Sequence, residues 1–144
     1  MNEHNILGVI LAGGKSKRMG KDKLFLKLNN KVLIEYTIDK VKKYFKNLII
    51  ITKQKNEYFS KKNLITVEDC IEGQLGPLVG ILTGMKWAKD NLKDCSWIAT
   101  FPCDTPFFPE KIIQEFIEKS KKRTQYYFAQ ALMDVNIIYL VCGL

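Results

Sequence analysis

The sequence predicts a three-layer α/β/α sandwich built around a mainly parallel β-sheet. Short apolar segments typical of buried strands alternate along the chain with segments whose apolar residues recur at helical spacing, and this alternation predicts βαβ units. The 144 residues are enough for one domain with a real core, and 47% hydrophobic and 26% charged residues are ordinary values for a globular chain. No repeat, low-complexity segment or linker divides the sequence, so we expect residues 1–144 to form a single domain.

The first half contains two strands of the kind that is buried on both faces. Ile6–Leu11 is a continuous apolar run that ends at a glycine pair, and residues 48–52 form a second run of the same type. Between them, residues 33–45 place apolar side chains at helical spacing, with charged side chains off that stripe. A polar segment at 54–62 is expected to form a short helix.

The second half continues the alternation of strands and helices. Residues 64–67 and 97–101 predict a third and a fourth strand. Pro77 opens a helix, because proline fits the first helical turn, and residues 109–121 predict another helix. Residues 126–132 and 137–142 are expected to form two further strands around a turn at 133–136. The apolar stripe expected to pack the Pro77 helix against the sheet consists of Leu78, Ile81, Leu82, Met85 and Leu92.

Two distinctive loops lie where such a sheet would bind a ligand. Ligands of open α/β sheets bind outside the carboxyl ends of the strands, at the point where the strand order reverses. If the first three strands run outward from strand one and strand four lies on its other side, the reversal falls between strands one and four. The loops at residues 12–20 and 102–109 follow those two strands, so we expect the binding site between them.

The loop that follows the first strand reads LAGGKSKRMGKDK over residues 11–23. Paired glycines let backbone N–H groups approach a ligand without obstruction by a Cβ atom, and five cations within nine positions suit a polyphosphate. Gly14 and Gly20 are one residue too far apart for a Walker-type P-loop. A dinucleotide fingerprint is also excluded, because its Gly-x-Gly-x-x-Gly pattern is absent and Thr52 and Lys53 occupy the place of its acidic residue.

The same loop resembles the signature Leu-Ala-Gly-Gly-x-Ser-x-Arg-Met-Gly-x-Asp-Lys of the nucleotidyltransferases of molybdenum cofactor synthesis, and is most similar to the molybdenum cofactor guanylyltransferases. Three further motifs agree in order and spacing: VED at 67–69, GPLVG at 76–80 and PCDTP at 102–106. The resemblance covers residue 6 to about residue 117. It implies a Rossmann-like nucleotide-binding sheet, transfer of GMP from GTP to molybdopterin, release of pyrophosphate and a requirement for Mg²⁺.

The resemblance also implies roles for individual residues. The backbone at 11–14 would hold the guanine, and a glycine pair here favours guanine over cytosine. Arg18 and Lys23 would neutralise charge on the nucleotide phosphates, which dominates catalysis of this kind of transfer. Asp104 would bind Mg²⁺, a hard cation that takes few protein oxygens and keeps water and phosphate as ligands. The implied catalytic residues are Arg18, Lys23 and Asp104, with Asp104 the metal ligand, and the implied nucleotide-binding residues are Leu11, Ala12, Gly13, Gly14, Lys23, Asp69 and Asp104.

The sequence departs from the family pattern in two places. The asparagine that the family places after its second strand has no clean counterpart, and Thr52 is the nearest residue. The similarity fades after Ser120, where family members continue for several dozen residues that include an Asn-x-Asn-Thr-Pro stretch and much of the molybdopterin side. We therefore expect a domain truncated at its C-terminus, with an intact nucleotide half, slow or absent transfer, and self-association through the uncharged segment 137–142.

Three other functions remain open at this point: a related cytidylyltransferase of the same fold, a nucleotide-binding remnant without turnover, and a basic nucleic-acid binder. The net charge of +8 is concentrated in residues 1–62, which hold 15 Lys and Arg against 5 Asp and Glu. Only Arg18 and Arg123 among these cations have the forked donors that read base edges, so we expect no nucleic-acid partner. Lys53 and Lys62 lie outside the glycine-rich loop and are expected to contribute little to phosphate binding.

The cysteine and histidine content narrows the chemistry further. Four scattered cysteines exclude a CxxC redox or zinc pattern, and a single histidine excludes a histidine-based metal site or catalytic relay. The sequence has no run of about 18 apolar residues and no basic-then-apolar leader. We therefore expect a cytoplasmic protein without a membrane partner, with Mg²⁺ as cofactor and with GTP and molybdopterin as its small-molecule partners.

Overall fold

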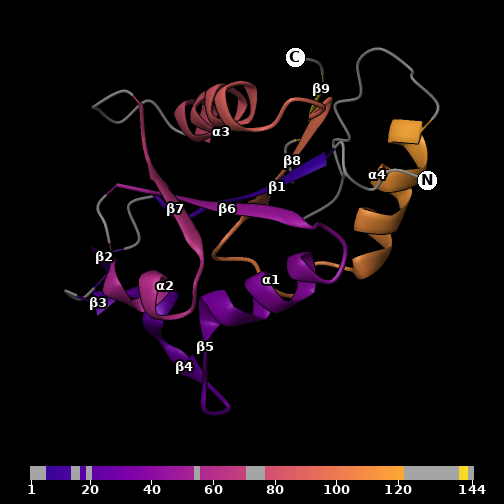
Figure 1. Ribbon diagram of the computed structural model, residues 1–144. Coiled ribbons are helices and arrows are strands. Elements are labelled where there is room, and N and C mark those ends of the chain that lie inside the picture. The colour runs from indigo at the N-terminus through magenta and orange to yellow at the C-terminus, as the bar shows by residue number, and fades with distance from the viewer. Residues whose placement is uncertain are drawn as a thin grey trace.

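The computed structural model describes residues 6–13, 17–18, 21–53, 56–70, 77–121 and 140–142, and they form the predicted α/β architecture. A five-stranded sheet has the order β7-β6-β1-β8-β9 (Figure 1). The first four of these strands are parallel, and β9 is antiparallel to β8. The sheet consists of β1 (Ile6–Leu11), β6 (Asn47–Thr52), β7 (Ile65–Glu68), β8 (Trp97–Pro102) and β9 (Leu140–Cys142).

Helices cover both faces of this sheet, which gives the three layers that the sequence predicts (Figure 1). The helix α3 (Pro77–Asn91) packs on one face, and α1 (Leu33–Lys42) and α4 (Glu110–Lys121) pack on the other. Phe59 of the short helix α2 (Glu57–Lys61) and Leu24 of the 3₁₀ turn η2 (Lys23–Phe25) belong to the same hydrophobic cluster as α1 and α4. The four helices and the four parallel strands of the sheet therefore lie where the sequence predicts them.

The central strand β1 supplies both cores because successive side chains point to opposite faces of a sheet. Leu7 and Val9 belong to the cluster under α3, whereas Ile6 and Ile10 belong to the cluster under α1 and α4. All four residues are at most 6% exposed. Such burial on both faces explains why the strand reads as a continuous apolar run rather than an alternating one.

The helix α3 turns a different face to the sheet from the one that its apolar residues predict. Leu78 is 69% exposed and Leu82 is 48% exposed, so the expected stripe is wrong at these two positions. Gly80 and Gly84 face the sheet instead: a Cβ atom on Gly80 would lie 2.7 Å from Leu11 Cδ2. The helix backbone approaches β1 more closely than large side chains allow, which brings the start of α3 against the end of β1.

Two small hairpins were not expected from the sequence. One pairs β2 (Lys17–Arg18) with β3 (Lys21–Asp22), and the other pairs β4 (Lys27–Leu28) with β5 (Lys31–Val32). At the other end of the chain, β9 confirms the last residues of the strand expected at 137–142. The strand expected at 126–132 and the turn at 133–136 lie outside the described residues. Within the described ranges, no helix has both the length and the apolar character needed to cross a membrane.

Candidate functional site

The carboxyl ends of the four parallel strands lie level with one another and define what we call the strand-end edge. Leu11 at the end of β1 is in register with Ile51 of β6 and with Pro102 of β8, and Thr52 of β6 is in register with Glu68 of β7. The order β7-β6-β1-β8 places the reversal between β1 and β8, as the sequence predicts. The residues that directly follow these four strands therefore meet at one edge, and they include Gly13, Lys53, Asp69 and Asp104.

Two backbone hydrogen bonds extend the sheet past the ends of its strands. Ala12 N donates to Ile51 O at 2.8 Å, and Asp69 N donates to Thr52 O at 3.1 Å. These bonds hold the first residues of the two loops in nearly strand-like positions. The loop after β1 and the loop after β7 consequently start from a rigid base, which is the condition for a precise binding site.

Gly13 and Asp69 are in direct contact at this edge. A Cβ atom on Gly13 would lie 2.9 Å from Asp69 Oδ2, closer than real Cβ contacts allow. The position of the Asp69 carboxylate therefore favours glycine at position 13, since a larger residue would have to displace that carboxylate. The structure thus brings together Gly13 and Asp69, two residues that the resemblance implies for nucleotide binding.

The Asp69 carboxylate is in an environment that disfavours its charge. Burial raises the pKa of the Asp69 carboxyl above its ordinary value, and the neighbouring Lys53 ammonium opposes that rise. Its Oδ1 atom is buried and accepts no hydrogen bond from any residue in the described part of the chain. A buried acceptor without a donor costs free energy, so this atom is well suited to accept a hydrogen bond from a bound ligand.

Lys53, which lies outside the glycine-rich loop, is also close to Gly13 and Asp69. Its Cγ atom lies 3.7 Å from the Cβ position of Gly13, and its ammonium is close enough to affect Asp69. Lys53 directly follows β6, so the signal that identifies it is its position after a central parallel strand rather than any motif. The motifs of the sequence do not identify Lys53, because it belongs to none of them.

A hydroxyl group of α3 fixes the other side of the Asp69 loop. Cys70 N donates to Thr83 Oγ1 at 3.0 Å, and Thr83 Oγ1 donates in turn to Val79 O at 2.8 Å. Thr83 is only 3% exposed. The Asp69 backbone is therefore held between β6 on one side and α3 on the other, and neither contact is visible in the motifs of the sequence.

Thr52, the residue nearest to the family's asparagine, has a buried side chain. It is 5% exposed, and its Oγ1 atom has no hydrogen-bond partner among the residues that the structure describes. The contact that the structure assigns to Thr52 is the one made by its carbonyl group, which accepts from Asp69 N. Thr52 thus supports the site through its backbone.

Asp104 lies in the loop between β8 and α4, two residues after the end of β8, and its side chain is exposed. In the described ranges its carboxylate makes no hydrogen bond or ion pair, and no group of three or more His, Cys, Asp or Glu side chains gathers into a metal cluster. A single free carboxylate at the strand-end edge fits a cation such as Mg²⁺, which binds one or two carboxylates together with water and phosphate oxygens.

The glycine-rich loop is described only in part. Arg18 ends β2, with its backbone paired to Lys21 of β3, and Lys23 begins η2, which Leu24 anchors in the core at 3% exposure. The side chains of Arg18 and Lys23 lie outside the described residues, as does the whole of Gly14. The roles implied for these three residues therefore stay predictions.

The chain is similar in sequence to known nucleotidyltransferases. The family model of the MobA-like NTP transferase domain matches residues 8–133 of this chain. The molybdenum cofactor guanylyltransferase of Yersinia pestis (strain Pestoides F) is 34% identical over 124 residues, which is 85% of this chain and 61% of that protein. A protein of the same name from Yersinia pseudotuberculosis (serotype O:3, strain YPIII) has the same identity and coverage. The chain thus spans about three fifths of the length of these relatives.

Solved structures share the fold. The crystal structure of a protein from Aquifex aeolicus VF5 is 30% identical and superposes with a TM-score of 0.59 over 80% of this chain and 58% of its own. A cytidylyltransferase from Leptospira borgpetersenii has a TM-score of 0.62 at 18% identity, covering 83% of this chain and 50% of its own. A Mycobacterium tuberculosis protein solved in complex with manganese has a TM-score of 0.55 at 18% identity, covering 82% and 60%. Because the last two structures are less than 25% identical to this chain in sequence, their similarity shows a shared fold and nothing more.

Proposed function

The chain belongs to the MobA-like NTP transferase family, and on that premise we propose that it transfers GMP from GTP to molybdopterin, the reaction named by its guanylyltransferase relatives. In this reaction a phosphate oxygen of molybdopterin forms a bond to the α-phosphorus of GTP. The bond from that phosphorus to the bridging oxygen of the β-phosphate breaks, and pyrophosphate leaves. The observation that carries the proposal is the contact of Gly13 with Asp69 at the strand-end edge, where the buried Asp69 Oδ1 atom has no hydrogen-bond donor among the described residues.

Residues at the strand-end edge supply the groups that bind the nucleotide in this proposal. The backbone of Leu11, Ala12, Gly13 and Gly14 binds the guanine in this proposal, because the chain leaves the sheet here and a glycine such as Gly13 lets a ligand approach the backbone closely. Asp69 accepts hydrogen bonds from N–H or O–H groups of the nucleoside through its unpartnered Oδ1 atom. Lys53 lies beside both groups and adds a positive charge that favours the anionic nucleotide.

The phosphates are placed against the cations of the glycine-rich loop in this proposal. Arg18 and Lys23 neutralise the charge that builds up on the leaving pyrophosphate, because fixed donors aimed at developing charge lower the barrier without reorganising. Asp104 holds Mg²⁺, whose chemistry when bound is to neutralise phosphate oxygens. The exposed Asp104 carboxylate supports this assignment because its residue lies two positions past the end of β8, the strand that neighbours β1 at the strand-end edge.

A transfer assay with two donor nucleotides tests the proposal and its alternatives. GTP or CTP is supplied with Mg²⁺ and molybdopterin, and both the nucleotide adduct and the released pyrophosphate are measured beside a longer Yersinia relative. We expect GMP adduct and pyrophosphate in equal amounts from GTP, formed more slowly than by the longer relative, and little product from CTP. A preference for CTP would establish a cytidylyltransferase instead. Tight GTP binding with no product, while the relative is active, would establish a nucleotide-binding protein without turnover.

Partners and location follow the same proposal. We propose GTP and molybdopterin as the small-molecule partners, Mg²⁺ as the cofactor and a cytoplasmic place of action, because these suit an enzyme of cofactor synthesis. A duplex nucleic acid is not proposed as a partner. Its binding would appear as an affinity that falls steeply with salt and is independent of GTP, and neither property is expected here.

A further inference from the structure

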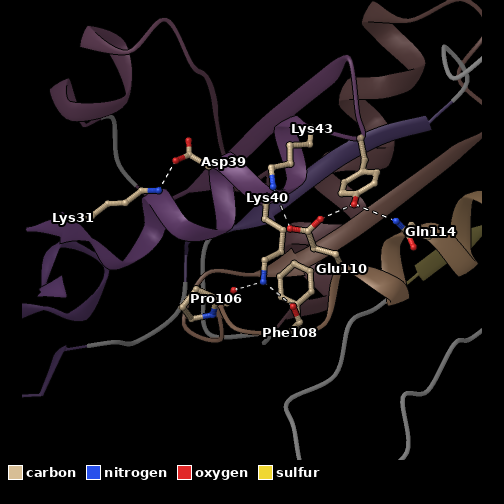
Figure 2. Close-up of polar contacts among 9 residues, drawn as sticks. Lys31, Asp39, Lys40, Lys43, Pro106, Phe108, Glu110 and Gln114 are labelled. Atoms are coloured by element: carbon tan, nitrogen blue, oxygen red, sulfur yellow. Dashed lines mark hydrogen bonds and ion pairs between the residues drawn. The ribbon is translucent and has the colours of Figure 1, made fainter. Parts of the chain in front are cut away.

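The loop that carries Asp104 is held by a side chain from a distant part of the sequence. Lys40 of α1 reaches the loop between β8 and α4, where its Nζ donates to Pro106 O at 2.8 Å and to Phe108 O at 2.7 Å (Figure 2). Its partners lie 66 and 68 residues further along the chain. A single ammonium group therefore binds two backbone carbonyls of the loop at once, which fixes the path of the backbone between them.

An aromatic ring completes the attachment. The Lys40 ammonium lies 4.5 Å from the centroid of the Phe108 ring, a cation–π distance. Phe108 is 4% exposed and stacks on Phe101 of β8, with ring centroids 5.5 Å apart and an angle of 20° between the rings. Lys40 thus binds a part of the loop that is itself anchored in the core. Its ammonium group contacts two carbonyls and an aromatic ring, unlike that of a lysine surrounded only by solvent.

Asp104 lies midway along the short span that these contacts define. Pro102 ends β8 and is fixed by its register with Leu11, and Pro106 is fixed by Lys40. Asp104 is two residues from each of these fixed points. The position of its carboxylate relative to Gly13 therefore depends on both ends, and Lys40 determines one of them.

Polar side chains just after the end of α1 make contacts of a different kind. Lys43 pairs with Glu110 Oε1 at 3.2 Å, and Tyr44 OH donates to Glu110 Oε2 at 2.6 Å (Figure 2). Gln114 Nε2 donates to Tyr44 OH at 3.4 Å. These contacts join α1 to the first turns of α4 and do not involve the carbonyls of the loop. Lys43 is consequently a control for Lys40, since it is a lysine three residues further along, at the C-cap of α1, whose contact is with Glu110 and not with the loop carbonyls.

We propose that Lys40 is a positioning residue for Asp104: by binding the carbonyls of Pro106 and Phe108 it holds the Asp104 carboxylate where a divalent cation and the nucleotide phosphates meet. The inference rests on the proposed function, because it needs Asp104 to act on the cation. It adds a residue outside every motif of the chain. Groups that orient a metal ligand without touching the metal commonly change metal affinity about 10-fold or more.

The test measures cation affinity and metal-free GTP affinity in the whole chain. Mn²⁺ binding in the presence of GTP is followed by electron paramagnetic resonance, and GTP binding without metal by calorimetry. We expect Lys40→Met to weaken Mn²⁺ binding about 10-fold with little change in metal-free GTP binding. Lys43→Met should change neither affinity by more than about two-fold, as for an exposed ion pair. Lys40→Arg keeps the donors and should recover most of the lost affinity.

A double-mutant cycle separates positioning from general destabilisation. In the Asp104→Asn background, Lys40→Met should have no further effect on Mn²⁺ affinity, because its effect passes through the carboxylate. Additive losses, or equal losses in Lys40→Met and Lys43→Met, would overturn the inference while leaving the proposed function intact. A wild-type protein that binds GTP without any dependence on the cation would overturn the assignment of Asp104 and the inference with it. If Lys40→Met does not melt cooperatively, Lys40→Gln is measured in its place by the same criteria.

Discussion

Asp69 combines an energetic cost with a binding role at the scale of a single residue. Its carboxylate packs on Gly13, its Oδ1 atom is buried without a donor in the described part of the chain, and burial raises its pKa. Lys53 offsets part of this cost through its positive charge. A residue kept in such an environment gives up stability of the free protein so that a ligand can satisfy it, which is common at binding sites.

Asp69→Asn is expected to stabilise the free protein and weaken GTP binding. Because the folded-state pKa of Asp69 is raised, the stability associated with its protonated form is present below the unfolded pKa and is lost as the pH rises through the folded pKa. Asparagine has no such loss. The gain in Tm of Asp69→Asn over wild type should therefore be larger at about pH 7.5 than at about pH 4.5. A gain that is the same at both values, measured by calorimetry, would refute the assigned cause.

Lys53→Met is expected to weaken GTP binding by about 1.5–3 kcal/mol, the value of a charge-assisted contact. Lys62→Met is the control, because Lys62 pairs with Glu35 of α1 and is not among the side chains nearest to Gly13. Arg18→Ala and Lys23→Ala should lose a similar amount to Lys53→Met. Equal losses at Lys62 and at the other three positions, measured by titration at constant salt, would indicate a diffuse basic field rather than a defined site.

At the scale of elements, α3 shows most clearly what the sequence can and cannot predict. Its existence and its start at Pro77 were predictable, because a proline followed by apolar residues at helical spacing indicates a helix. Its orientation was not, since an apolar-stripe reading counts Leu78 and Leu82 as core and gives no weight to Gly80. Close approach between helix and strand depends on small residues, whose signal is the absence of a side chain.

The candidate site divides in the same way. Gly13, Asp69 and Asp104 belong to motifs, so the sequence identifies them. Lys53 and Lys40 belong to none, because their roles arise from the register of β6 beside β1 and from the packing of α1 on a loop more than 60 residues away. Such contacts depend on tertiary structure, and single-sequence patterns carry no information about them. The hairpins β2–β3 and β4–β5 could not be predicted from the sequence, because strands of two residues are too short to show a periodicity.

Thr83→Val tests the attachment of the Asp69 loop to α3. Valine keeps the shape of threonine but leaves Cys70 N without its acceptor, which should cost about 0.5–1.5 kcal/mol, the net value of one hydrogen bond. We expect a lower Tm and weaker GTP binding, both measured by calorimetry. Thr83→Ser retains the hydroxyl group and should bind GTP nearly as the wild type does. If serine and valine weaken GTP binding equally, the hydrogen bond has no part in holding Asp69.

At the scale of the whole molecule, β9 is one of the two edge strands in the described sheet order, and β7 is the other. The segment 137–142 is uncharged, and an uncharged outer strand offers backbone groups to another chain. We predict a concentration-dependent dimer in sedimentation velocity that Val141→Lys shifts toward monomer. Leu78→Lys on α3 is the control, because it replaces an exposed apolar side chain that belongs to a helix and not to an edge strand. A monomer at all concentrations, or an equal shift in both variants, would refute association through β9.

The central proposal, a GTP–Mg²⁺ site at the strand-end edge, is tested most directly by titrating GTP into the wild-type protein and Asp104→Asn with and without Mg²⁺. Asp104→Asn replaces a negatively charged ligand of the cation by a neutral one, so it should weaken Mg²⁺-dependent binding far more than metal-free binding. The predicted result is a wild-type affinity that Mg²⁺ increases several-fold, and an increase that Asp104→Asn largely abolishes. No GTP binding by the wild type, or equal loss with and without Mg²⁺ in Asp104→Asn, would contradict it.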